Sequence, residues 1–414
     1  MGDLIVELYD VHIGTLVRTG ASFDFVAERA AIEKFGLDST VLSLAVPLAV
    51  VPARARRDRR QNFFRELLPE GRMLSRLAQN AGVAEHDVVG MLRQYGRDIA
   101  GALQIWDPKG PGEPKTPATE PLTPSGVADL LRNVTSFPLA NKPLSGKTSL
   151  AGVQDKVVLA RSAQGWAHVV DGYPSTHILK PESRDYPTII YDEEYGSRFA
   201  RALGLADFAT HIEEFDGVPA LVVERYDRMG TADGEPPSRI HQEDFNQVLG
   251  LRGDQKYQRI GGKASLARIA RELTVTVGRE SAVRLARMAT LAAAIGNLDL
   301  HAKNVSLLHS PDGSVELAPA YDVVPQVHLP NDGELALAVD RTYRHAAVTR
   351  AHLAAEFASW GLRDSNDVVE QTLTMVLETA HREEPDPRAH ADLVRDITRF
   401  ATNLLAGLPA GDGA

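Results

Sequence analysis

The chain contains no cysteine among its 414 residues, and this absence excludes disulfide bonds, thiolate zinc sites and a cysteine nucleophile together. A reducing compartment is compatible with this composition, so we expect a cytoplasmic protein. Hydrophobic residues make up 43% of the chain and charged residues 24%, which is ordinary usage for a globular protein. The composition therefore excludes global disorder and predicts a large buried core.

Long apolar runs and an excess of positive charge are also missing. The most apolar window, VLSLAVPLAVVPA at 41–53, is shorter than the ~20 residues of a membrane helix and is interrupted by Pro47. The N-terminal sequence MGDLIVELYDVHIG has no basic region followed by an apolar block, so we expect no secretory signal. The formal net charge of −10 argues against general attachment to nucleic acid or anionic membrane.

The length suggests two or three units, and the hydrophobic pattern changes along the chain. Period-two alternation in the first forty residues predicts strands, and helical spacing follows from Asn62. Residues 109–126 carry five prolines, which predicts a connector. Short β-branched runs come next, then a mainly helical part whose last residues, LAGLPAGDGA, are expected to be frayed. The predicted segments are an N-terminal subdomain at 1–106, a connector at 107–144, a strand-rich lobe at 145–230 and a helical lobe at 231–414.

The segment GNLDLHAKNVSLL at 296–308 concentrates chemistry-bearing side chains between a helical run and a strand-like run. Asp299 and Asn304 are five positions apart, the spacing of a phosphoryl-transfer catalytic loop. There the carboxylate accepts a hydroxyl proton, and the amide oxygen coordinates magnesium without adding charge. The alternative is a polar turn that caps a helix.

A second carboxylate, Asp322, follows 23 residues later in LAPAYDVVP. Because hard cations prefer oxygen donors, a carboxylate held between two apolar runs suits a second magnesium ligand. Hydrogen bonding of Asp322 within its own proline-flanked turn is the alternative.

Three upstream segments complete the pattern of a nucleotide site. Lys180 ends the strand THILK, where an ammonium group binds phosphates, and Glu194 in the next helix is its candidate partner. The small-residue turn that starts at Ser149 precedes another strand and leaves backbone N–H groups for phosphates. In ALVVERYDR, Glu224 and Tyr226 are candidates for holding adenine. The alternatives are a surface lysine, a solvated acidic face, a plain β-turn and surface ion pairs.

The order of these segments resembles that of the HipA-type serine/threonine kinases, the toxin halves of bacterial toxin–antitoxin pairs. The small domain that such toxins carry ahead of the kinase core is similar to FFRELLPEGRMLSRLA at 63–78 with GRDIAGAL at 96–103. The kinase motifs that carry the resemblance are SLAGVQDK (149–156), THILK (176–180), VERYDR (223–228), HQEDFNQ (241–247) with KY (256–257), GNLDLHAKN (296–304) and AYDV (320–323).

The resemblance implies an α+β, kinase-like bilobal fold with a strand-rich N-lobe, a helical C-lobe and a small N-terminal α/β subdomain. It also implies ATP and Mg²⁺ as cofactors and assigns a role to each matching residue. Ser149 would be the site of inhibitory autophosphorylation. The other implied roles are catalysis for Asp299 and His301, metal binding for Asn304 and Asp322, and nucleotide binding for Ala151, Gly152, Val153, Gln154, Asp155, Lys156, Lys180, Glu224, Tyr226 and Tyr321.

The activity implied for the chain is phosphorylation of a translation component, such as an aminoacyl-tRNA synthetase, with growth arrest and persistence as the result. The implied partner is a HipB-like helix-turn-helix antitoxin, with DNA reached only indirectly through it and no membrane involved. A small-molecule kinase and a non-catalytic, antitoxin-bound scaffold are the alternatives. The five arginines of ARARRDRR at 53–60 predict a solvated basic face, with an antitoxin or DNA contact as the alternative.

Overall fold

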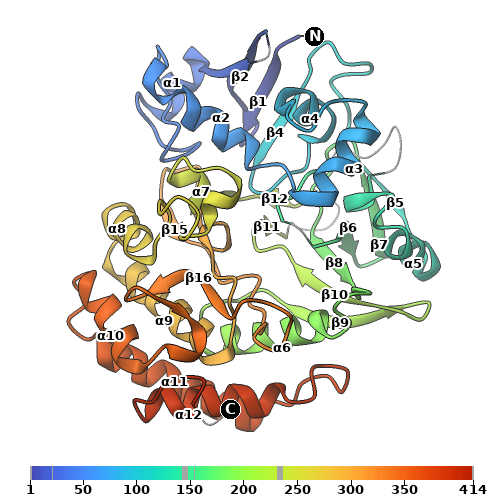
Figure 1. Ribbon diagram of the computed structural model, residues 1–414. Helices are drawn as coiled ribbons and strands as arrows, with labels where there is room; N and C mark the ends of the chain where they lie inside the picture. Colours follow the sequence, from blue (N-terminus) through green and yellow to red (C-terminus); the bar gives the residue numbers. More distant parts are fainter. Residues whose placement is uncertain (1, 21, 142–147, 153, 231–235, 413–414) are drawn as a thin grey trace. The chain divides into compact units, whose positions relative to one another are not determined.

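The chain folds into two compact units that each combine segments far apart in the sequence (Figure 1). The computed structural model describes residues 2–20, 22–141, 148–152, 154–230 and 236–412. Unit 1 comprises Met1–Pro181, Glu213–Gly253 and Leu308–Val315. Unit 2 comprises Glu182–Ile212, Asp254–Leu307 and Glu316–Ala414.

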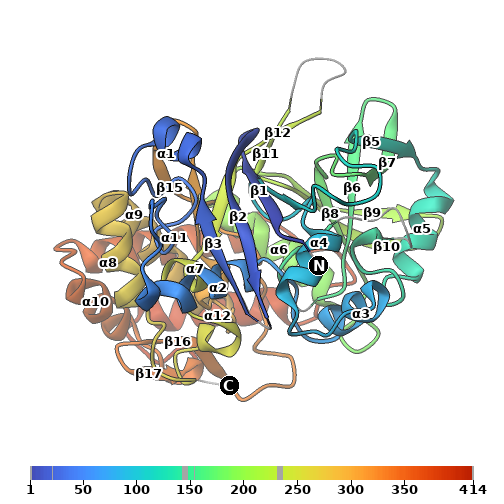
Figure 2. The same cartoon turned by 90° about the horizontal axis from the view of Figure 1, so that it is seen from above.

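Unit 1 begins with a four-stranded antiparallel sheet in the order β3-β2-β1-β4, and β1, β2 and β3 lie side by side in Figure 2. Buried and partly exposed side chains alternate along β1, as the period-two pattern predicts, so the predicted opening sheet is confirmed. Phe63 and Phe64 are fully buried on α2, and the Phe64 ring contacts Phe23 and Phe25 of β3. The bounds are β1 Leu4–Leu8, β2 Val11–Thr19, β3 Ser22–Ala27, β4 Leu103–Trp106, α1 Arg29–Phe35, α2 Arg57–Arg65, α3 Gly71–Ala81 and α4 Val88–Tyr95.

A larger sheet in unit 1 has the strand order β5-β7-β6-β8-β10-β9, and the last strand belongs to this unit only from Glu213 onward. The pairs β5–β7, β7–β6, β6–β8 and β8–β10 are all antiparallel. Apolar side chains of α5, β6, β8 and β10 form one core cluster with Trp166 and Phe215. The bounds are β5 Ala118–Pro121, β6 Val157–Ser162, β7 Gly165–Val170, β8 His177–Pro181, β9 Thr210–Phe215, β10 Val218–Glu224 and α5 Pro124–Arg132.

The predicted connector at 107–144 is wrong for part of its length, because β5 and α5 lie within it. Thr123 caps α5, and its hydroxyl oxygen accepts a hydrogen bond of 3.1 Å from the Gly126 N–H. Proline is tolerated at the first position of a helix and on an edge strand, where no backbone donor is required. The proline density of this segment was therefore a poor guide to its structure.

The remaining elements of unit 1 are short, and β14 and β15 are shared between the units along the chain. The helix α7 is closed by a capping box between Asp244 and Gln247. The bounds are β11 Arg228–Met229, β12 Ser238–Arg239, β13 His241–Asp244, α7 Phe245–Val248, β14 Ser306–His309 and β15 Val315–Leu317.

Unit 2 is mainly helical, as predicted for the later part of the chain, and α9 lies at its centre. This helix is buried at nearly every residue from Leu285 to Ile295 and packs against α6, α8, α11 and α12. The bounds are α6 Ile189–Ala202, α8 Leu266–Thr276, α9 Arg279–Ile295, β16 Glu334–Val339, β17 Thr342–Arg344, α10 Arg350–Ser359, α11 Ser365–Arg382 and α12 Leu393–Leu405.

The C-terminal tail is anchored as far as Asp412, so the predicted frayed tail is wrong for this part. The N–H of Ala410, which is fully buried, donates to the Val348 carbonyl at 2.8 Å. The Asn403 side-chain amide donates to the carbonyls of Ala410 and Asp412. Small residues let the backbone approach its partners closely, and the resulting hydrogen bonds hold the segment.

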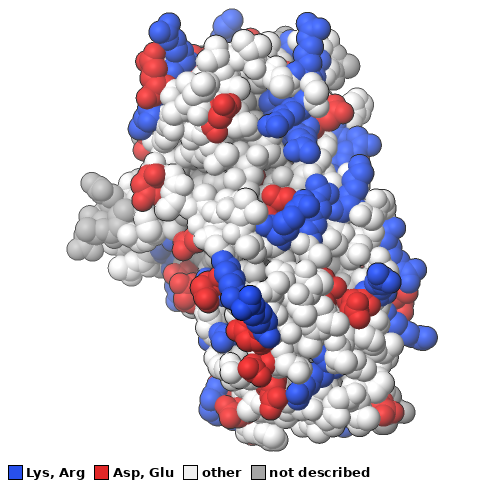
Figure 3. Space-filling model, turned by 90° about the vertical axis from the view of Figure 1, so that its left-hand side faces the viewer, with Lys and Arg blue, Asp and Glu red and all other residues white. Residues whose placement is uncertain are grey.

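The basic segment 53–60 is solvated only in part. Arg54, Arg56 and Arg59 are exposed, whereas Arg60 is buried and donates two hydrogen bonds to Asp24, at 2.6 and 2.9 Å. The face shown in Figure 3 carries both basic and acidic side chains. Arg57, which is half-buried, also donates to the Phe23 carbonyl at 3.3 Å, so two arginines of this segment hold β3 and the exposed ones leave the predicted basic face as a smaller patch.

Candidate functional site

The loop after α9 is held in shape by its own polar side chains. Gly296 ends the helix in the left-handed conformation, with φ of 70°, and a Cβ there would lie 2.7 Å from Val327 Cγ2. The Asn297 side-chain oxygen accepts from the Asp299 N–H at 2.9 Å, and the Asn304 amide donates to the Asp299 carbonyl at 2.9 Å. These bonds hold Asp299 and Asn304 in the same turn.

Asn304 and Asp322 lie together within unit 2. The Asn304 amide nitrogen is 3.5 Å from Asp322 Oδ2, and Asp322 has a left-handed φ of 56°, which is uncommon outside glycine. The Tyr321 hydroxyl bonds the Lys303 carbonyl at 2.5 Å and the Ser306 hydroxyl at 2.6 Å, and so ties the Asp322 segment to the loop. Mg²⁺ takes oxygen ligands from proteins, so the amide oxygen of Asn304, whose nitrogen bonds Asp299 and Asp322, and the Asp322 carboxylate are the atoms that would hold this metal.

His301 is buried beside Asp299. Its pKa is lowered to about 3, because burial disfavours the charged ring and the Lys256 and Lys303 ammonium groups oppose it more than Asp322 favours it. His301 Nε2 lies 3.8 Å from Asp299 Oδ2. At neutral pH the imidazole is therefore neutral, and the two side chains form no ion pair.

Two buried lysines mark unit 1. The register of β6 and β8 pairs Val157 with Leu179, so the next position along places Lys156 opposite Lys180. Both lysines are buried, with 8% and 6% of their surface exposed. Two ammonium groups on neighbouring segments of the sheet offer positive charge that phosphate oxygens would accept.

The turn before β6 packs against the N-terminal part of the same unit. The Ser149 side chain has no exposed surface, and its hydroxyl donates to the Leu67 carbonyl at 3.0 Å. The Gly152 carbonyl accepts from the Glu70 N–H at 3.2 Å, and Lys156 Nζ donates to the Ala151 carbonyl at 3.0 Å. Of the predicted nucleotide-binding loop, Gln154 and Asp155 are partly exposed, and Val153 lies outside the described residues.

The charged side chains after β10 form buried ion pairs, not the surface ion pairs that the sequence also allowed. Glu224 is exposed and Tyr226 is half-buried, but Arg225, Asp227 and Arg228 are buried. Arg225 bonds both carboxylate oxygens of Asp227, at 2.9 and 2.7 Å, and Arg228 lies 3.1 Å from Asp98. A buried ion network therefore joins this segment to the GRDIAGAL sequence, while Glu224 and Tyr226 stand on either side of its first arginine.

The acidic run of α6 is also buried rather than solvated. Asp192, Glu193 and Glu194 have 0%, 3% and 4% of their surface exposed, which overturns the solvated-face interpretation. Glu194 bonds Arg198 at 2.8 Å. The helical spacing of four residues brings the two side chains together and compensates part of the buried charge.

Tyr257 joins the catalytic-type residues of unit 2, although no spacing rule pointed to it. Its hydroxyl donates to Asp299 Oδ1 at 3.3 Å across 42 residues of chain. The only signal in the sequence was its place in the KY pair of the resembling motifs.

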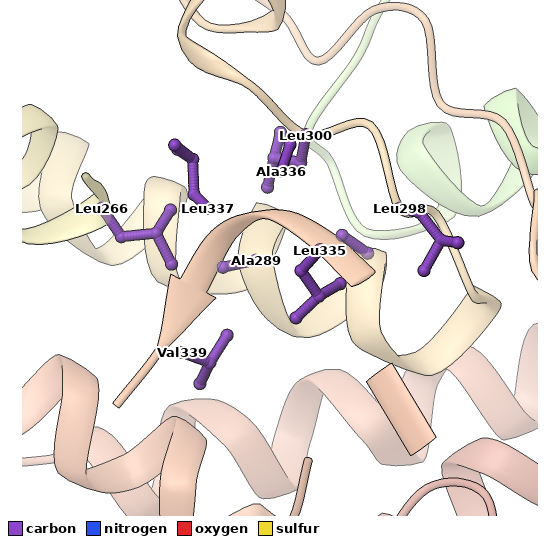
Figure 4. A pocket seen from close by; sticks show the side chains of 9 residues that line it. Leu266, Ala289, Leu298, Leu300, Leu335, Ala336, Leu337 and Val339 are labelled. Carbon is purple, nitrogen blue, oxygen red and sulfur yellow. The ribbon is translucent and has the colours of Figure 1, made fainter. Parts of the chain in front are cut away.

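Leu298 and Leu300, on either side of Asp299, reach into a small apolar pocket of unit 2 (Figure 4). The other lining residues are Leu266, Ala289, Ala292, Leu335, Ala336, Leu337 and Val339. Asp299 is thus flanked by two leucines whose side chains line this pocket.

The predicted site residues fall into two groups. Asp299, His301, Asn304, Tyr321 and Asp322 gather within unit 2. Those of unit 1 are Ser149, Ala151, Gly152, Gln154, Asp155, Lys156, Lys180, Glu224 and Tyr226. Within the part of the chain that the structure describes, no helix is both long and apolar enough to cross a membrane.

Two family profiles cover most of the chain. The profile of the HipA N-terminal domain matches residues 4–106, and that of the HipA-like C-terminal domain matches residues 148–383. The chain is 34% identical over 296 residues to the putative kinase Y4mE of Sinorhizobium fredii, covering 70% of this chain and 69% of that protein. It is 29% identical over 369 residues to the serine/threonine-protein kinase toxin HipA of Shewanella oneidensis, covering 85% and 83%.

A solved structure has a similar fold. It is the complex of HipA, HipB and operator DNA from the Shewanella oneidensis MR-1 toxin–antitoxin system. The match has a TM-score of 0.77 at 24% sequence identity and covers 97% of this chain and 96% of that one. The expected kinase-like α+β fold class is confirmed by this similarity.

Proposed function

Since the chain belongs to the HipA family, we propose that it is an ATP- and magnesium-dependent protein serine/threonine kinase. The observation that carries this proposal is the convergence of Asp299, Asn304 and Asp322 within one unit, because the 22 residues between the two aspartates do not require it. Phosphoryl transfer needs this set, a base for the acceptor hydroxyl and oxygen ligands for magnesium.

The reaction assigned to Asp299 is a proton transfer coupled to phosphoryl transfer. The acceptor oxygen forms a bond to the γ-phosphorus while the bond from that phosphorus to the β–γ bridging oxygen breaks. The hydroxyl proton passes to the Asp299 carboxylate, and ADP leaves with the bridging oxygen. Magnesium held by Asn304 and Asp322 would neutralise charge on the phosphates. The neutral His301 ring lies 3.8 Å from Asp299 Oδ2 and brings no positive charge to the base.

Nucleotide binding falls to unit 1 in this proposal. Lys156, just before β6, and Lys180, in β8, would hold phosphate oxygens as point charges. The loop from Ala151 to Lys156 would lie along the nucleotide, and Glu224 and Tyr226 would contact adenine. Tyr321, whose hydroxyl is already bonded to Lys303 and Ser306, would contribute its ring rather than its hydroxyl.

Ser149 is proposed as a site of self-phosphorylation that switches the enzyme off. Its hydroxyl is fully buried against Leu67, so the turn must leave this position before phosphate can be added. A phosphate carries about −1.5 to −2 charges and would not fit back into a site that offers one carbonyl oxygen. Phosphorylation would thus hold the turn away from the nucleotide site.

The biological role proposed is that of the toxin in a toxin–antitoxin pair, with a HipB-like helix-turn-helix protein as its partner. Support comes from the Shewanella oneidensis relative, which is named a kinase toxin, and from the similar structure, which is a complex of HipA with HipB and operator DNA. A translation component such as an aminoacyl-tRNA synthetase is the proposed substrate class, in a cytoplasmic setting.

The test is transfer of labelled phosphate from γ-labelled ATP to proteins of a host lysate and to the purified chain itself. We expect labelled protein with the wild type and a loss of about 10²-fold or more with Asp299→Asn. Asp312→Asn, at an exposed turn, is the matched control and should leave transfer unchanged. Label on a metabolite but never on protein would replace this proposal with a small-molecule kinase, and equal transfer by Asp299→Asn would refute it.

A further inference from the structure

The hydroxyl of Tyr257 donates to one oxygen of the Asp299 carboxylate, Oδ1, at 3.3 Å. The other oxygen, Oδ2, lies on the side of the neutral His301 ring. Because the two carboxylate oxygens have different neighbours, we infer that Tyr257 is a positioning residue, which orients the catalytic base toward the acceptor hydroxyl. The inference rests on the proposed kinase function, since it assigns Tyr257 a part in that reaction.

The ring of Tyr257 is held on two sides. It meets the His301 ring edge to face, with 5.3 Å between the centroids and 73° between the planes. The ammonium group of Lys256 lies 5.2 Å from the centroid of the tyrosine ring. Lys256 itself is buried, so the tyrosine is packed between two buried side chains of fixed position.

The backbone next to Tyr257 is tied to the catalytic loop through β16. The Gln258 N–H donates to the Ala336 carbonyl at 2.9 Å, and the Gln258 side-chain oxygen accepts from the Ala338 N–H at 2.9 Å. The Ala336 N–H in turn donates to the carbonyl of Leu298 at 2.8 Å. One strand therefore sets the position of both Tyr257 and the residue before Asp299.

This arrangement limits how the carboxylate can rotate. A carboxylate has two equivalent oxygens, and rotation about its bonds would present either of them, in any direction, to a substrate. A hydrogen bond to Oδ1 limits this rotation, which is the preorganisation that catalytic groups require. The alternative is that the Tyr257 hydroxyl occupies the position of the acceptor hydroxyl and blocks substrate binding. The experiment distinguishes this alternative from positioning.

The experiment compares wild type, Tyr257→Phe, Asp299→Asn and the double variant in self-phosphorylation with γ-labelled ATP over a range of ATP concentrations. Phenylalanine keeps the ring against His301 and removes only the hydroxyl. We expect the maximal rate of Tyr257→Phe to fall about tenfold or more, as for the loss of a hydrogen bond to a charged group. The half-saturating ATP concentration should stay unchanged, the melting temperature should fall no further than in Tyr195→Phe, and the double variant should be no slower than Asp299→Asn.

Tyr195→Phe is the matched control, because it also removes one tyrosine hydroxyl bond of unit 2, to the Glu383 carbonyl at 2.9 Å. It should leave the maximal rate unchanged. A maximal rate of Tyr257→Phe equal to that of the wild type would overturn the positioning role while the kinase proposal stands. A faster variant would identify the hydroxyl as a block, and a change in half-saturating ATP alone would make Tyr257 a nucleotide contact; either result rejects positioning. Absence of transfer by the wild type would refute both proposals.

Discussion

The side-chain amide nitrogen of Asn304 lies 3.5 Å from the carboxylate of Asp322, although the two residues are 18 positions apart in the chain. The connection runs through β14 and β15 and returns to the loop that carries Asp299. The two residues of the proposed magnesium site therefore lie at the two ends of the segment that contains β14 and β15.

Removal of either proposed metal ligand should raise the magnesium requirement. For Asn304→Ala and Asp322→Asn we expect the half-saturating Mg²⁺ concentration for phosphate transfer to rise by about tenfold or more, with partial recovery of rate at high Mg²⁺. A magnesium titration at fixed ATP measures this. Asn331→Ala, in an exposed turn, serves as the control. An unchanged magnesium dependence in both variants would remove these residues from the metal site.

Loss of either buried lysine of unit 1 should weaken nucleotide binding. A hydrogen bond to a charged group contributes about 1.5–3 kcal/mol, so Lys156→Met and Lys180→Met should each raise the dissociation constant for ATP by about 10- to 100-fold. Direct titration of the nucleotide, without turnover, is the measurement. Lys34→Met, on an exposed part of α1, should bind as the wild type does. Wild-type affinity in both lysine variants would contradict the assignment.

Substitutions of Ser149 should distinguish the buried hydrogen bond of its hydroxyl from its proposed role as a phosphorylation site. Ser149→Ala loses one hydrogen bond, which costs about 1 kcal/mol of unfolding free energy, and it should retain ATP binding while a self-phosphorylated form disappears. Ser149→Asp places a charge where the structure offers Leu67 O, so we expect weaker ATP binding than in Ser149→Ala. Mass spectrometry and nucleotide titration test the two statements. A phosphorylated form that persists in Ser149→Ala would place the modification elsewhere.

The buried pair of Arg225 and Asp227 should make unit 1 sensitive to acid. Burial alone would raise the pKa of Asp227, but the charges of Arg225 and Arg228 outweigh it and leave the pKa well below its usual value. A carboxyl whose pKa is depressed on folding stabilises the fold above its unfolded pKa of about 3.9, and this contribution is lost as the pH falls below about 4. Urea unfolding at pH 7 and at stepwise lower pH should reveal the loss.

The matching substitution contrasts a buried pair with an exposed one. Asp227→Asn leaves Arg225 short of a buried counter-charge and should cost about 3–5 kcal/mol of unfolding free energy at pH 7. Asp129→Asn removes the exposed partner of Arg132 and should cost about 0–1 kcal/mol. Equal costs for the two variants would contradict the structural role given to the buried network.

The sequence alone determined the local elements and the order of the motifs. The opening strands, the central helices and the loop around Asp299 followed from apolar periodicity and residue type, because those signals depend on neighbours a few positions away. The same local rules failed at the prolines of β5 and α5, the acidic run of α6 and the C-terminal tail. There, edge pairing, burial against other helices and distant carbonyls decided the outcome.

Only the tertiary structure decided which side chains meet. The contact of Tyr257 with Asp299 spans 42 positions, and the pairing of Val157 with Leu179, which brings the neighbouring Lys156 toward Lys180, depends on strand register. No spacing in the chain encodes such contacts, since they arise when β16 pins two distant segments or when two strands pair antiparallel. Residue types thus indicated the chemistry of this protein, and long-range packing determined the geometry in which those residues are held.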